Sequence, residues 1–123
     1  MLRSLIVFFI VALFSVGCFN LNVKEHNEHY YQIQLCNNLN GKMEYVLKDK
    51  TRIDCLTDKY AIEVDFAKKW AESIGQSLYY AKMTDKKPAV ALIVGEKDNR
   101  FIQRLEKVTQ ELNIKVFIIK KEN

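Results

Sequence analysis

The spacing of apolar and polar residues along the chain changes repeatedly between the period of a helix and the period of a strand. In chain order, the pattern predicts a helix, three strands, a helix, a strand, a helix and a final strand. These predicted elements cover residues 25–38, 44–47, 52–56, 61–67, 68–82, 89–94, 99–112 and 115–119. Helices and strands in this order predict an α/β fold with a mixed central sheet flanked by helices.

The N-terminal segment has the pattern of a targeting sequence. Arg3 supplies its one positive charge, and residues 5–14 form an almost unbroken apolar run. Ser15 and Gly17 then supply small residues at the positions that a signal peptidase reads. The run is too short to cross a hydrocarbon core of roughly 30 Å. Residues 1–17 are therefore predicted to be a signal peptide, and the remainder to be exported.

Cys18 directly follows the predicted cleavage point, as the acylated cysteine of a bacterial lipoprotein does. Ser15 stands where that lipoprotein box prefers Leu, so ordinary cleavage and release is an equal alternative. The product is then either anchored to the membrane through Cys18, or free in the periplasm or secreted. In this interpretation residues 18–26 form an N-terminal tether and residues 27–123 form one domain.

Composition agrees with one small folded domain. The chain has 123 residues, 49% of them hydrophobic, with 19 Lys and Arg against 15 Asp and Glu. These values exclude a disordered chain, and the single Pro and four Gly exclude collagen-like or linker-rich sequence. Removing residues 1–17 takes away only Arg3, so the charge stays mildly positive and leans weakly toward anionic partners.

Export changes the interpretation of the two remaining cysteines. Outside the cytosol thiols oxidise, so Cys36 and Cys55 are a candidate disulfide. The closed loop of about 20 residues would contribute on the order of 3 kcal/mol through loop entropy. The competing interpretation, a metal site, lacks the paired cysteine spacing that such sites use.

Three acidic residues fall on the second and third predicted strands. Glu63 and Asp65 are two positions apart, so they share one face of a strand, and Asp54 faces away from the apolar residues beside it. If the two strands pair, the three carboxylates converge and repel one another, which proteins tolerate where a cation neutralises them. Oxygen ligands suit Mg²⁺ or Mn²⁺. The alternative is that this is simply a solvated face of the sheet.

The helix predicted over residues 68–82 adds polar groups beside these acids. At about 100° per residue, its polar stripe consists of Lys69, Ser73, Gln76 and Tyr80. Its core stripe consists of Trp70, Ala71, Ile74, Leu78 and Ala81. We therefore expect Lys69 and Gln76 on the rim of the acidic cluster.

These features together resemble the PD-(D/E)XK nuclease superfamily, which has the restriction-endonuclease-like fold. The family's core order of helix, three strands, helix and strand is similar to that of residues 25–94. The family's first acid resembles Asp54, although Ile53 replaces the usual Pro, and the (D/E)-x-K element falls on residues 63–65. The resemblance implies an αβββαβ core and a Mg²⁺- or Mn²⁺-dependent nuclease.

The resemblance also implies roles for single residues. Asp54 and Glu63 would ligate the metal. Gln76 and Tyr80 fit the Q-x-x-x-Y helix motif of an exonuclease branch linked to bacterial recombination, and would contact the nucleotide. Glu28 lies where several branches place an accessory acid.

The chain departs from the family at the motif lysine, since Asp65 stands in its place. Some branches move that lysine to the following helix, where Lys69 would reach over the same acids. Asp65 would then be a third metal ligand or hold a second ion, and Arg52 would contact the phosphate backbone. If Lys69 points away, the domain is a non-cleaving relative.

The sequence therefore supports two functions. The first is a metal-dependent phosphodiesterase acting on nucleic acid outside the cytoplasm, with DNA favoured over RNA. The second is a non-catalytic binding module of the envelope that reuses the fold. A domain this small has little room for elements that read sequence, so specificity would be low or supplied by a homodimer.

Overall fold

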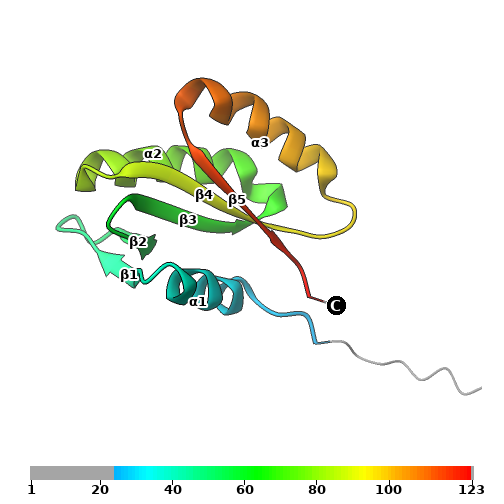
Figure 1. Cartoon of the computed structure of the whole chain (residues 1–123), viewed down its shortest axis with the longest axis horizontal. Helices are drawn as coiled ribbons and strands as arrows, with labels where there is room; N and C mark the ends of the chain where they lie inside the picture. Colours follow the sequence, from blue (N-terminus) through cyan, green and yellow to red (C-terminus); the bar gives the residue numbers. More distant parts are fainter. Residues whose placement is uncertain (1–23, 123) are drawn as a thin grey trace, which may run out of the picture.

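A five-stranded mixed sheet lies between two layers of helices in the computed structural model of the protein, which describes residues 24–122 (Figure 1). In chain order the elements are α1 (Glu28–Asn38), β1 (Lys42–Val46), β2 (Arg52–Leu56), β3 (Tyr60–Phe66), the 3₁₀ turn η1 (Ala67–Lys69), α2 (Trp70–Thr84), β4 (Lys87–Val94), α3 (Asn99–Leu112) and β5 (Lys115–Lys120). The α/β architecture and the order of its elements are those that the sequence pattern predicts. The predicted signal peptide and Cys18 lie outside the described residues. Within the described part, no helix is long and apolar enough to cross a membrane.

Some elements begin where hydrogen bonds place them and not where the apolar pattern suggests. The first helix begins at Glu28 and not at residue 25, because Asn27 is its N-cap. The Asn27 side-chain oxygen accepts a hydrogen bond from the Tyr30 N–H at 3.0 Å. Strand β4 extends back to Lys87, because its parallel ladder with β3 starts at that residue.

The sheet joins an antiparallel half to a parallel half. The strand order is β1-β2-β3-β4-β5, with antiparallel pairs β1–β2 and β2–β3 and parallel pairs β3–β4 and β4–β5. The parallel crossovers run through α2 and α3, which both cover one face of the sheet, while α1 covers the other (Figure 1). The central strands β3 and β4 are therefore covered on both faces, which explains why residues 61–65 and 89–93 are buried without interruption.

Side chains of β3 and β4 alternate between two hydrophobic cores. The core under α1 contains Tyr31, Cys36, Cys55, Ile62, Val64, Ala89, Ala91 and Ile93. The core under α2 and α3 contains Ala67, Ile74, Val90, Leu92, Leu105 and Ile114. Glu63 and Asp65 alternate with the apolar residues of β3, yet they are only 4% and 5% exposed. The acids are thus buried groups, and the interpretation of a solvated face is wrong.

A disulfide between Cys36 and Cys55 ties α1 to β2, as predicted from the cysteine count. The two Cα atoms are 5.6 Å apart, within the range of unstrained bridges, and both residues are fully buried. The chain passes so close to the bridge at Gly41 that a Cβ there would lie 2.7 Å from Cys36 Sγ and nearer still to Cys55 Sγ. A side chain at residue 41 would therefore collide with the disulfide.

Strand β2 departs from regular alternation at Asp54. Residues two apart on a regular strand share a face, but Cys55 packs under α1 while Ile53 packs with Ala61 and Tyr80 on the α2 side. The paired positions of β2 and β3 are Cys55 with Ile62 and Leu56 with Ala61, so the ladder ends just before Asp54. The two strands separate there, and this opening is called the fork below.

Helix α2 is rotated relative to the orientation that its apolar pattern predicts. Ser73 and Ser77 are fully buried and Tyr80 is 6% exposed, whereas Leu78, predicted for the core, is 37% exposed. The reason is a polar contact across the core, because Ser73 Oγ donates a hydrogen bond to Asp65 Oδ2 at 2.8 Å. A buried acid on the sheet thus turns the small polar face of the helix inward.

Candidate active site

The fork opens into a groove with a volume of about 440 Å³, which α1, β2, β3 and α2 all border. Of the residues singled out from the sequence, it gathers Glu28, Arg52, Asp54, Glu63, Asp65, Lys69 and Gln76. Helix α1 lies on the opposite face of the sheet from α2, so residues from both layers meet only because β2 and β3 separate. The break in β2 therefore creates the place where these side chains converge.

Glu63 is the most unusual group in the groove. Its side chain is buried, and its Oε1 atom has no hydrogen-bond partner. Burial, followed by the negative charges of Asp54 and Asp65, raises the pKa of Glu63 to about 9. A buried carboxyl oxygen without a partner is rare, and it is often explained by a ligand or by a catalytic role.

Asp54 holds the edge of the fork through both its side chain and its main chain. Its Oδ2 accepts a hydrogen bond from the Val64 N–H at 2.8 Å, and its carbonyl accepts one from Gln32 Nε2 at 2.9 Å. Burial raises the pKa of Asp54, although the bond from the Val64 N–H works against that shift. The Asp54 carboxylate therefore stands where the main-chain ladder is interrupted.

Asp65 connects the acids to helix α2 and to Lys69. Besides accepting the bond from Ser73, it lies with Oδ1 3.8 Å from Lys69 Nζ. The Lys69 side chain is 48% exposed and points to the acids, so the lysine does not turn away from the cluster. Glu28 approaches from α1, and its burial and the charge of Asp65 raise the pKa of Glu28 to about 7.

A polar network supports this edge of the groove, and the sequence singled out only one of its members, Arg52. Gln32, only 3% exposed, also donates a hydrogen bond to Glu44 Oε1 at 3.1 Å, and Arg52 Nε lies 3.2 Å from Glu44 Oε2. Glu44 lies in β1 between Met43 and Tyr45, which pair with Cys55 and Ile53 of β2. Its backbone has φ 54°, in the left-handed region. The irregular residues of β1 and β2 therefore lie next to each other.

The spacing of α1 contained a signal for part of this network. Gln32 lies four residues after Glu28, so both side chains point from the same face of one helix. No comparable sequence signal marks Glu44, because its position depends on the distortion of β1.

Tyr80, assigned to the polar stripe of the helix from the sequence, does not face the groove. It is buried with Ile53 and Ala61, and burial together with the charges of Glu63 and Asp54 raises the pKa of its hydroxyl. In this position Tyr80 packs beneath the acids and is not available to stack on a nucleotide. Gln76, by contrast, is half-buried and lines the groove.

The donor set fits a hard divalent cation in its chemistry, since it consists of carboxylate oxygens and includes the unpartnered Glu63 Oε1. As the side chains are placed within residues 24–122, however, no group of three or more His, Cys, Asp or Glu is arranged as a metal site. One Asp54 oxygen binds the Val64 N–H, and Asp65 contacts Ser73 and Lys69. The carboxylates would have to turn toward a common point to hold an ion.

Comparison with known proteins adds no relative to these observations. No family model matches the chain, and neither a curated protein nor a solved structure matches it. The resemblance to PD-(D/E)XK nucleases that the sequence suggests therefore stays a hypothesis, which rests on the order of the elements and on the residues of the groove alone.

Proposed function

We propose that the protein is a divalent-metal-dependent phosphodiesterase that cleaves nucleic acid in the cell envelope or outside the cell. The observation that carries this proposal is Glu63, a buried carboxyl with an unpartnered oxygen, among other acids at the floor of an open groove. The proposal includes the finer fold assignment, a restriction-endonuclease-like αβββαβ core formed by α1 to β4.

The electrostatics of the groove favour a cation. A buried carboxylate without a partner is costly, and neighbouring carboxylates of like charge increase that cost. A protein keeps such an arrangement where function requires it, and perturbed carboxyl groups in a cleft are typical of catalytic sites. A divalent ion would neutralise Asp54, Glu63 and Asp65 together.

Each residue of the groove then has a task. Asp54 and Glu63 would hold Mg²⁺ or Mn²⁺, with Asp65 as a further ligand. When bound there, the ion supplies Lewis-acid activation of the phosphate and lowers the pKa of a water molecule. Lys69 would orient the attacking water or stabilise negative charge at the phosphorus, the task of the missing motif lysine. Gln76 would hydrogen-bond to the substrate at the rim.

A second candidate, a binding module without catalysis, has one observation in its favour. Within the described residues no set of side chains forms a ready-made metal site, and Asp65 occupies the position of the motif lysine. Such a module would bind a partner through the same groove without cleaving it.

A cleavage assay separates the two candidates. Purified protein is incubated with supercoiled plasmid and with a labelled single-stranded oligonucleotide, in Mn²⁺, in Mg²⁺ and in EDTA. We expect cleavage that requires metal, is lost in Glu63→Gln and falls at least about 100-fold in Lys69→Met, because each removes a group from the reacting centre. Glu111→Gln, an exposed acid on α3, is the control and should cleave normally.

Absence of metal-dependent cleavage, with both substrates intact, would refute the proposed activity and leave the binding module. The proposed location is tested separately by mass analysis of the N-terminus of the exported protein, which should begin at Cys18. A lipid-modified Cys18 would identify the anchored form and an unmodified residue the free form.

A further inference from the structure

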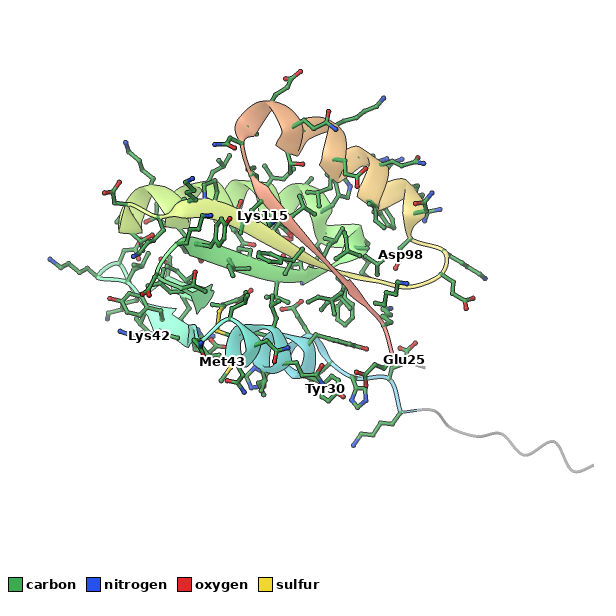
Figure 2. All side chains as sticks on the ribbon, in the orientation of Figure 1. Glu25, Tyr30, Lys42, Met43, Asp98 and Lys115 are labelled. Atoms are coloured by element: carbon green, nitrogen blue, oxygen red, sulfur yellow. A yellow bond between two sulfur atoms is a disulfide. The ribbon has the colours of Figure 1, made fainter. Side chains whose placement is uncertain are left out.

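A second cavity, with a volume of about 580 Å³, lies at the carboxyl ends of the parallel strands. Phe66 ends β3, Asp98 follows β4 and Lys121 follows β5, and all three line it. In Figure 2, Glu25 and Asp98 lie at this end of the molecule, opposite Lys42 and Met43. Open α/β sheets commonly bind ligands outside the carboxyl ends of their strands.

The cavity and the acidic groove share a thin wall. Asp65 lines the groove and Phe66 the cavity, and likewise Lys69 lines the groove and Lys68 the cavity. Consecutive Cα atoms are about 3.8 Å apart, so a single stretch of chain from the end of β3 through η1 separates the two spaces. The two spaces are therefore neighbours on either side of this stretch of chain.

The lining of the cavity combines free cations with aromatic surface. Lys68 and Lys121 form no ion pair with any of the residues 24–122, and Lys121 Nζ lies 5.0 Å from the centre of the Phe66 ring. His26 stacks on Tyr30 with ring centres 3.6 Å apart, which covers one face of the imidazole and holds the ring in place. Ammonium groups bind phosphate, and aromatic rings stack on bases.

Three acids line the cavity: Glu25 is exposed, and the other two, Asp98 and Glu122, are already engaged by the protein. Asp98 Oδ2 accepts a hydrogen bond from the Gly95 N–H at 2.8 Å. Glu122 accepts one from the Tyr30 hydroxyl at 2.8 Å and lies 3.7 Å from His26 Nε2. Within the described part of the chain, the two lysines thus remain without carboxylate partners while Asp98 and Glu122 are engaged, so an anion that carries an aromatic ring can pair with the two lysines.

From these observations we infer that the cavity is a nucleotide subsite, holding the nucleotide next to the scissile phosphate of a single-stranded nucleic acid. Its volume falls in the range of roughly 300–1,000 Å³ that small-ligand sites occupy, which suits one nucleotide and not a duplex. The inference rests on the proposed function for the position of the scissile phosphate, but binding itself requires no metal.

The test is binding of a fluorescently labelled oligothymidylate, followed by anisotropy in EDTA so that neither metal nor cleavage contributes. Lys68→Gln/Lys121→Gln is compared with Lys107→Gln/Lys115→Gln, which removes the same charge from elsewhere. Lys115 is a close match for Lys121, because Lys115 begins β5 and Lys121 directly follows it. Lys115 Nζ also lies near an aromatic ring, 5.5 Å from the centre of Phe117.

We expect the cavity variant to bind at least about tenfold more weakly than the wild type, with a smaller salt dependence, and the control pair to stay within about twofold. His26→Ala should weaken binding by at least about fivefold through lost stacking. Equal loss in both lysine pairs, or no binding by the wild type, would overturn the subsite.

The outcomes separate this inference from the proposed function. Binding that maps to the cavity without any metal-dependent cleavage would refute the phosphodiesterase and retain the subsite. Cleavage together with equal binding by the two lysine pairs would refute the subsite and retain the phosphodiesterase.

Discussion

Replacing Glu63 by Gln is expected to stabilise the metal-free protein at alkaline pH, although it removes a carboxylate that the proposed chemistry needs. The pKa of Glu63 is raised from its ordinary value of 4.5 to about 9 by burial and by the charges of Asp54 and Asp65. Between these values the folded protein keeps a proton that the unfolded chain has released. The free energy of unfolding must therefore fall as pH rises, and the loss is complete only above the folded pKa.

The magnitude follows from the linkage relation. One proton corresponds to at most about 1.4 kcal/mol per pH unit, so the wild type should lose up to about 2.7 kcal/mol between pH 6 and pH 8. Glu28, with its pKa raised to about 7, adds a loss of the same sign below that pH. The amide that Glu63→Gln introduces cannot ionise, so the variant keeps the part of the stability that the wild-type carboxyl loses.

The assay is urea unfolding followed by circular dichroism in EDTA at pH 6, 7 and 8, for the wild type, Glu63→Gln and the exposed control Glu111→Gln. Added Mn²⁺ should offset this loss in the wild type and not in Glu63→Gln, because saturation at 100 times the dissociation constant stabilises a competent site by about 2.7 kcal/mol. A wild-type curve that is flat from pH 6 to pH 8 and matches that of Glu63→Gln would refute the reasoning. Indifference of the wild type to Mn²⁺ would refute the metal site.

Three further predictions concern the framework of the groove. Replacing both Cys36 and Cys55 by Ala should lower the free energy of unfolding by about 3 kcal/mol in urea titrations, from lost loop entropy; an unchanged midpoint would contradict this. Gly41→Ala should cost about 1–3 kcal/mol by overpacking against the disulfide, and a double-mutant cycle with the cysteine-free protein should show a smaller loss there. Gln32→Leu should cost about 1–3 kcal/mol, because it leaves the half-buried carbonyl of Asp54 without its donor; thermal melting with no shift would contradict this.

The sequence predicted the fold well where local pattern decides the structure. The order of elements follows from periodicity, and the disulfide follows from two cysteines in a chain that carries a predicted export signal. Strand β2 and helix α3 begin and end at the predicted residues. The sequence also predicted that Asp54, Glu63 and Asp65 lie together, on the assumption that side chains alternate regularly along both strands. The structure corrects that assumption, because the alternation of β2 breaks at Asp54.

The failures occur where a tertiary contact overrides the pattern. The rotation of α2 depends on the hydrogen bond from Ser73 to Asp65. Hydropathy cannot predict this, because Ser73 is buried only by virtue of its contact with another buried polar residue. Tyr80 was assigned to the polar stripe for the same reason, and the rotated helix buries it. The position of Glu44 depends on the left-handed backbone of β1, which the sequence of an ordinary strand does not indicate.

The hydrogen bond from the Val64 N–H to Asp54 Oδ2 makes one main-chain amide a spectroscopic reporter of the groove. Any ligand that draws the Asp54 carboxylate away would release this proton, which should shift its NMR resonance and speed its exchange with deuterium. The same bond decides how Asp54 should be varied, because Ala would remove the hydrogen bond that spans the fork and confuse lost chemistry with lost structure. Asn keeps an oxygen acceptor in place, so it removes the charge while leaving an acceptor for the Val64 N–H.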